Sequence, residues 1–199
     1  MHNLENNPRF RKIVVESGDV AELGEQLGTL FRPEILGIFE RDHSDPNLGD
    51  RMDRTTGMIE AMEGVDFGKK HLRELYASAD VLGVPRKEYV CSSVEDETED
   101  CPRSDRCSTG VTTALDGSIL LAHNEDGPKG YPNLLYLTEV VMGGMSSLHG
   151  LYPGTLDRNA FGVTQYGLVY AVRTHRQHRG RGPRLPAHSI ARYLADAPN

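Results

Sequence analysis

The spacing of apolar residues predicts a strand and then a helix near the start of the chain. A β-branched run at residues 13–15 ends at Ser17-Gly18, which indicates a strand and a break. Asp19 is suited to cap the helix that follows. The apolar residues of that helix recur at helical spacing and are Val20, Leu23, Leu27, Leu30 and Phe31. Pro33 is expected to split or kink the segment.

A second helical region is predicted at residues 55–81, after a polar loop at residues 41–54. Its methionines are interpreted as core filling. Gly64 and Gly68 are expected to interrupt the helix.

Two glycines lie one turn apart in the first helix, at Gly24 and Gly28. Glycine inside a helix costs about 1 kcal/mol relative to alanine. Close packing against a neighbouring element would explain both residues, and a weak helix is the alternative.

Strands dominate the pattern from residue 107 onward. Residues 107–114 and 118–122 flank a turn at Asp116-Gly117 and predict a hairpin. Two further strand regions and a last helix are predicted at residues 134–142, 161–172 and 187–195. Helices followed by strands predict an α+β layered domain.

An acidic cluster separates the two halves, and it predicts a solvated linker. The cluster consists of Glu95, Asp96, Glu97, Glu99 and Asp100, with Pro102 behind it. We therefore divide the chain into a helical part, residues 1–106, and a β-rich part, residues 107–199.

Composition excludes several classes of protein. The 199 residues are 38% hydrophobic and 26% charged, which is typical of a soluble globular protein. The net charge of −7 disfavours binding to nucleic acid or to an anionic membrane over the whole surface. We see neither a signal-like apolar segment nor an apolar run long enough to cross a bilayer, so the sequence predicts a cytoplasmic protein without membrane or nucleic-acid partners.

The three cysteines are Cys91, Cys101 and Cys107, an odd number with no CxxC pair. Neither a disulfide framework nor a zinc site is expected, and no cofactor is predicted. A basic stretch at residues 173–184 could receive phosphates, but a solvated loop is the favoured interpretation.

Cys107 is the candidate nucleophile. The predicted hairpin brings it beside the polar quartet His123-Asn124-Glu125-Asp126. A nucleophile needs a base, and a free α-amine on the nucleophilic residue itself can serve as one, since it titrates near pH 8. This solution requires cleavage of the Arg106–Cys107 peptide bond. The alternative is an inert, half-buried thiol.

At these residues the chain resembles the acyl-coenzyme A:isopenicillin N acyltransferase family, and within it the members that hydrolyse β-alanyl amides such as carcinine. The family keeps a Cys, a Thr two residues on, a turn with Gly and a polar segment ending in Asp. Cys107, Thr109, Gly117 and Asp126 stand at those places. A second match runs from residue 159 to residue 172 and continues into Gly182-Pro183-Arg184 and a helix.

The resemblance implies a four-layer αββα N-terminal-nucleophile sandwich, incomplete at its C-terminal end because family chains are usually much longer. Residues 1–106 would be the propeptide or α-subunit, and residues 107–199 a partial β-subunit. Cleavage would leave a heterodimer of the two subunits.

The resemblance also assigns roles. Cys107 would be the nucleophile for self-cleavage and for the substrate, Thr109 would support cleavage, and Asp126 would position the new amine or the substrate, a turn residue being the alternative. His123 and Asn124 would line the pocket, and Arg173 stands where the family has an oxyanion-hole Asn. The chain also has Arg106 where many members have Gly.

The resemblance thus implies a cysteine amide hydrolase or acyltransferase that acts on linear C–N amide bonds of small molecules. Coenzyme A thioester would be a substrate only in a transferase. The competing prediction, from another functional class, is an inactive truncated relative that serves as a binding or assembly partner.

Overall fold

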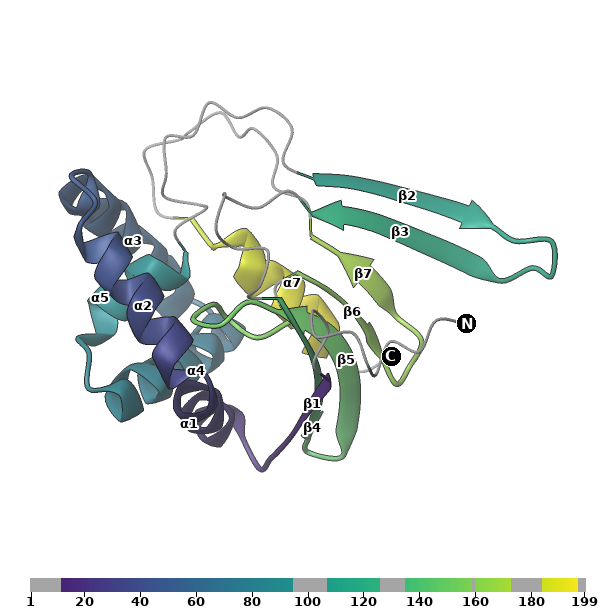
Figure 1. The fold of residues 1–199 in the computed structure, drawn as a ribbon, viewed down its shortest axis with the longest axis horizontal. Helices are drawn as coiled ribbons and strands as arrows, with labels where there is room; N and C mark the ends of the chain where they lie inside the picture. The colour runs from purple at the N-terminus through teal and green to yellow at the C-terminus, as the bar shows by residue number, and fades with distance from the viewer. Residues whose placement is uncertain (1–11, 95–106, 126–134, 159, 173–183, 197–199) are drawn as a thin grey trace.

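The computed structural model describes residues 12–94, 107–125, 135–158, 160–172 and 184–196. It is an α+β fold in which helices lie against one face of a five-stranded sheet, and a hairpin projects from this body (Figure 1). None of the helices in this part of the chain combines the length and the apolar character needed to cross a bilayer.

The predicted first strand and capped helix are confirmed. Strand β1 (Lys12–Ser17) leads into helix α1 (Val20–Leu30). The Asp19 carboxylate accepts hydrogen bonds from the backbone N–H groups of Ala21 and Glu22, at 2.8 Å and 3.0 Å. These bonds lower the pKa of Asp19, because they stabilise the ionised carboxylate. Pro33 splits the helical segment as expected, since it lies in the first turn of α2 (Arg32–His43).

The predicted loop at residues 41–54 is wrong. Helix α2 continues to His43 and helix α3 (Leu48–Glu63) begins four residues after its end. Arg51 explains the polar sequence, because its buried guanidinium pairs with Asp45 at 3.1 Å and reaches the carbonyl of Cys91. These residues are therefore polar because they bind one another across a tight connection.

Two helices follow α3. Gly64 ends α3 as expected, whereas Gly68 lies inside α4 (Asp66–Leu82), so the predicted interruption at Gly68 is wrong. A Cβ at Gly68 would lie 2.3 Å from the carbonyl oxygen of Met62, which indicates close packing. Helix α5 (Arg86–Ser93) had no counterpart in the sequence prediction.

The two glycines of α1 allow it to lie directly on α4. A Cβ at Gly24 would come within 2.1 Å of the carbonyl oxygen of Glu74, and a Cβ at Gly28 within 2.7 Å of a methyl group of Val81. Ser78 of α4 donates a 2.8 Å hydrogen bond to the Gly24 carbonyl. Close packing, and not a weak helix, therefore explains these glycines.

The main sheet has the order β1-β4-β5-β6-β7. Strands β4 (Tyr136–Met142), β5 (Met145–Leu151), β6 (Phe161–Thr164) and β7 (Val169–Ala171) form an antiparallel series, and β1 pairs with β4 in parallel. The predicted strands near 134–142 and within 161–172 are confirmed. Strand β5, joined to β4 through Gly143 and Gly144 at positive φ, was not predicted.

The two faces of this sheet differ. Val15, Val140 and Leu151 project towards the helices and join the main hydrophobic core with Leu23 and Leu75. The opposite face, here called the open face, carries an apolar row in which β5, β6 and β7 place Leu148, Val163 and Val169 in line. Glu139 of β4 separates this row from Val14 of β1. Val14 is 57% exposed and Val169 is 50% exposed.

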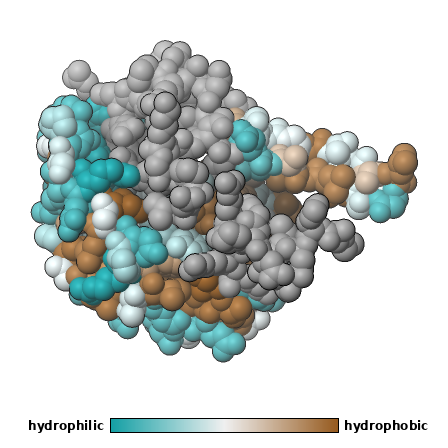
Figure 2. Space-filling view, in the orientation of Figure 1, coloured by the Kyte–Doolittle hydropathy of each residue, from teal (hydrophilic) through white to brown (hydrophobic). Residues whose placement is uncertain are grey.

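Strands β2 (Cys107–Thr113) and β3 (Ile119–Glu125) form a separate two-stranded sheet, here called the arm. The predicted hairpin is confirmed, with Gly117 at a φ of +84° in its turn. The arm projects from the body, and Figure 2 shows apolar surface along it.

The last helix, α7 (Ala187–Asp196), is confirmed at the predicted place. It packs against α4 and β6, far from both in sequence.

We expect Gly24→Ala to destabilise the protein by more than about 1 kcal/mol, because the new methyl group would force α1 away from the backbone of α4 and outweigh the gain in helix propensity. Gly37→Ala in α2 is the matched control, since a Cβ there would have nothing within 4 Å. Urea unfolding should show a lower free energy of unfolding for Gly24→Ala and an equal or higher one for Gly37→Ala. Equal effects would contradict the packing argument.

Candidate functional site

Cys107 is the first residue of β2, and its side chain is half-buried. The other described cysteine, Cys91, is buried in α5 and belongs to the core. Cys101 lies outside the described residues. Among the thiols that the structure describes, Cys107 is therefore the one accessible to a reagent or substrate.

Thr109 and His123 lie beside Cys107 on the same face of the arm. They are directly opposite each other in the β2–β3 ladder, and the Thr109 hydroxyl is 2.8 Å from Nδ1 of His123. Cys107 is two residues before Thr109, and side chains alternate along a strand, so all three project to one side. Cys107 and His123 are diagonal neighbours across the ladder, and such pairs have their Cβ atoms about 7–8 Å apart or somewhat less.

His123 joins the arm to the body. Its ring lies 6.2 Å from the ring of Phe161 in β6, centroid to centroid. Burial lowers the pKa of His123, which favours the neutral imidazole near pH 7. Its Nε2 atom is buried and has no hydrogen-bond partner among the described residues. A neutral ring that already contacts Thr109 can therefore exchange one further hydrogen bond with a bound molecule.

The other predicted site residues lie differently. Asn124 is opposite Ser108 in the ladder, so it projects from the face of the arm that does not carry Cys107. Asp126 and Arg173 lie outside the described residues, so their predicted roles stay predictions. Most of the basic stretch at residues 173–184 also lies outside the described residues. Within the described part of the chain, His, Cys, Asp and Glu side chains form no group of three or more that could hold a metal ion.

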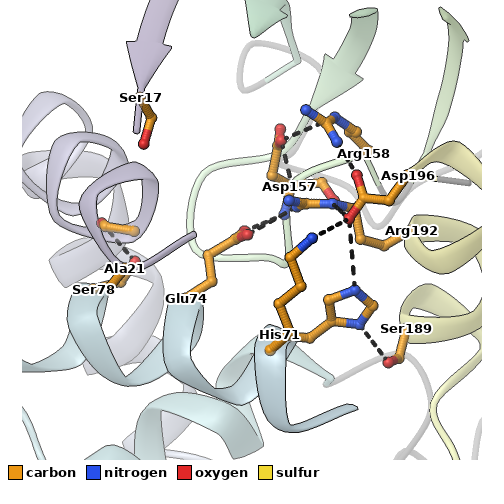
Figure 3. A network of polar contacts seen from close by, with 12 residues as sticks. Ser17, Ala21, His71, Glu74, Ser78, Asp157, Arg158, Ser189, Arg192 and Asp196 are labelled. Carbon is orange, nitrogen blue, oxygen red and sulfur yellow. Dashed lines mark hydrogen bonds and ion pairs between the residues drawn. The ribbon is translucent and has the colours of Figure 1, made fainter. Parts of the chain in front are cut away.

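A second cluster of reactive side chains lies in the body, centred on Arg192 of α7 (Figure 3). Arg192 is fully buried and its guanidinium contacts Glu74 of α4 at 2.8 Å, Asp196 of α7 at 3.0 Å and Asp157 of the β5–β6 loop at 3.5 Å. Arg158 pairs with both Asp157 and Asp196. We call these five residues the ion cluster.

Three carboxylates face two guanidiniums in the ion cluster, and Lys70 lies 3.7 Å from the carboxylate of Asp196 at its edge. Burial raises the pKa of Glu74 to about 7, against the opposing effect of Arg192. Burial also acts to raise the pKa of Asp157, but His149 at 2.5 Å and the two arginines outweigh it and lower that pKa. Glu74 is therefore the carboxylate of the cluster that takes up a proton most readily, and its two oxygens accept from Arg192 and from the backbone N–H of Asp157.

Ser189, His71 and Asp196 lie in a line next to the ion cluster. The Ser189 hydroxyl is 2.7 Å from Nδ1 of His71, and Nε2 of His71 is 4.0 Å from Asp196. This order resembles a nucleophile, a base and an acid. However, Ser189 and His71 are both buried, and burial, aided by Arg192, lowers the pKa of His71 to about 3. A substrate has no route to this hydroxyl through the described surface, so we interpret the line as structural.

The sequence prediction missed the ion cluster and its neighbours because the members come from three distant segments. One signal was present: His71, Glu74 and Ser78 recur at helical spacing on the same face as Leu75 and Leu82. Polar residues on a core-facing stripe require buried partners.

Comparison of the chain with protein-family models and with curated proteins found no match.

The ion cluster generates a pH prediction for His71. Its folded pKa lies below the ordinary 6.5, so between pH 6.5 and about 3 the unfolded chain binds a proton at this residue that the folded chain does not. Stability should therefore fall as the pH is lowered through this range, by up to roughly 1.4 kcal/mol per pH unit. The groups around His71 are Lys70, Arg158, Arg192 and Asp196.

Urea unfolding of wild type and His71→Gln at several pH values measures this contribution, and the difference between them should shrink as the pH falls. His43→Gln is the control. Burial acts to lower the pKa of His43, but the hydrogen bonds of its ring with the Glu88 carboxylate and the Phe39 carbonyl, together with the charges of Glu88 and Asp42, outweigh it and the pKa is raised. The contribution of His43 to the free energy of unfolding is therefore complete below pH 6.5 and is lost as the pH rises. Below pH 6.5, His43→Gln should thus leave the change of stability with pH as it is in wild type. A constant difference for His71→Gln would contradict the prediction.

Proposed function

We propose that the chain is an amide hydrolase or acyltransferase that uses Cys107 as its nucleophile and cuts itself before this residue. The observation that supports this most directly is the half-buried thiol at the start of β2, on the same face as a hydrogen-bonded Thr–His pair. The sequence resemblance described above adds the substrate class, a small molecule with a linear C–N amide bond.

Maturation follows from the chemistry of a thiol next to its own peptide bond. The Cys107 sulfur attacks the carbonyl carbon of Arg106, a C–S bond forms, the C–N bond breaks, and the thiol proton goes to the released α-amine. Water then hydrolyses the thioester, which leaves a carboxyl group on Arg106 and restores the thiol. One water molecule is consumed.

Turnover repeats this chemistry on a substrate. The free α-amine of Cys107 takes the thiol proton, and the thiolate attacks the substrate carbonyl. The amine product leaves with that proton. Water, or an acceptor amine in a transferase, then releases the acyl group, and acyl-coenzyme A would enter as the acyl donor in the transferase case.

His123 and Thr109 have supporting roles in this proposal. A neutral His123 does not repel a protonated α-amine, and its ring orients the Thr109 hydroxyl towards the face that carries Cys107. The oxyanion would need donors nearby. Arg173 stays the sequence-based candidate for that role, and Asp126 for orientation of the amine, whereas Asn124 projects from the opposite face of the arm and does not fit the role.

The finer fold assignment is also part of the proposal. The helices and the main sheet would be two layers of an αββα sandwich, and the apolar open face is the surface on which a second β layer would pack.

One observation favours a second candidate function, that of a binding or assembly partner without catalysis. The arm exposes apolar side chains, which is typical of an interaction surface. An intact-mass measurement separates the two functions, since an uncut chain whose Cys107 is inert to thiol electrophiles would favour the binding role.

Purified wild-type protein should separate into residues 1–106 and a fragment that begins at Cys107. Cys107→Ala should abolish cleavage, because no thiol is left to attack the preceding carbonyl. Intact-mass measurement and N-terminal sequencing follow both fragments. Cys91→Ala is the control for loss of a cysteine elsewhere and should still cleave. A wild-type chain that stays whole after long incubation would overturn the self-cleavage proposal.

Thr109→Val should slow cleavage by about fivefold, since the side chain keeps its shape and loses a hydrogen bond worth about 1 kcal/mol. Thr113→Val changes a threonine on the same face of β2, further from Cys107, and should cleave at the wild-type rate. Thr109→Ser should restore the rate. If all three variants cleave alike, Thr109 has no part in maturation.

A further inference from the structure

The arm leaves unusual surface exposed for a folded protein. Val111 is 66% exposed and Ile119 is 75% exposed. Within the described residues, the outer edges of β2 and β3 have no strand beside them. An isolated two-stranded hairpin is at best marginally stable in water. The arm therefore needs a surface to pack on.

The arm also lacks the features that normally keep exposed strands apart. Between residues 108 and 121 the one charged side chain is Asp116, which lies in the turn. Native edge strands usually carry lysines, prolines or inward-pointing charges for this purpose. The flat sides of the arm are thus suited to apolar contact.

One face of the arm forms an apolar surface of its own. Val111 is directly opposite Leu121 in the ladder, and Thr113 is opposite Ile119, so these side chains project to the same side. This is also the side that carries His123. The open face of the main sheet presents an apolar row through Leu148, Val163 and Val169, which Glu139 of β4 separates from Val14.

Among the described residues of one chain, these two apolar surfaces meet at the root of the arm. The contact there is His123 with Phe161, and Phe161 projects from the same face of the sheet as Val163. Beyond the root the arm extends away from the body (Figure 1), and Val111 and Ile119 of the arm and Val169 of the open face are exposed.

We propose that two copies of this chain exchange arms, so that the apolar side of each arm packs on the open face of the other copy. In a dimer with twofold symmetry both apolar surfaces of each copy are buried, because each copy supplies one arm and receives one. The contact is sheet on sheet, with the usual spacing of about 10 Å between the layers. The arm of the second copy would then lie where the proposed sandwich has its second β layer, but no step of the cysteine chemistry enters the contact.

Sedimentation velocity of the full chain over a wide range of concentrations should show a dimer. Ile119→Lys on the arm and Val169→Lys on the open face should each lose the dimer, because each places a charge in both contacts. Leu30→Lys is the matched control, since Leu30 is 50% exposed on α1, away from both surfaces, and this variant should stay dimeric. Circular dichroism would establish that the variants are folded.

A mixture of the two monomeric variants distinguishes exchange from other modes of pairing. In an exchanged pair of one Ile119→Lys and one Val169→Lys chain, the unaltered arm meets the unaltered open face, so the mixture should regain dimer. A monomeric wild type, or a Val169→Lys chain that still dimerises, would overturn the proposal. Cys107→Ala should dimerise like wild type, so failure of the proposed chemistry and failure of the exchange are separate results.

Discussion

The buried guanidinium of Arg192 is the constraint on which the arrangement of the body depends. An unpaired buried charge costs several kcal/mol, so Arg192 can be buried only where carboxylates surround it. Those carboxylates come from α4, from the β5–β6 loop and from α7 itself. Helix α7 is therefore held in place by the directional ion pairs of Arg192 as well as by apolar contact.

Two local features of the backbone depend on the same cluster. Arg158 is the one non-glycine residue with positive φ, at 62°, in the described part of the chain. Its pairing with Asp157 and Asp196 offsets the cost of that conformation. Glu74 acts on two neighbours, because its carboxylate binds Arg192 while its backbone carbonyl lies against Gly24 of α1. Helices α1 and α7 are thus positioned by one residue of α4.

The sequence predicted those elements whose signals are local. Asp19 before a helical apolar pattern, Pro33 in a first turn and Asp116-Gly117 between β-branched runs each act within a few residues, and the structure follows them. The first half of helix α3 and strand β5 escaped prediction because their polar residues have partners in other parts of the fold. Arg51 reaches Asp45 and the Cys91 carbonyl, and His149 pairs with Asp157. At the candidate site, the sequence predicted a hairpin that brings Cys107 beside residues 123–126, but only the register showed that His123 lies on the same face as Cys107 and that Asn124 does not.

The parallel pairing of β1 with β4 has a consequence for any chain that is cut before Cys107. Strand β1 would then belong to one fragment and β4 to the other, and the α4–α7 contact through Glu74 and Arg192 would likewise join two separate polypeptides. Such a protein is a non-covalent complex, so its unfolding is also a dissociation. Its recovery from denaturant would be second order in fragment concentration, whereas the uncut chain would refold at a rate independent of concentration.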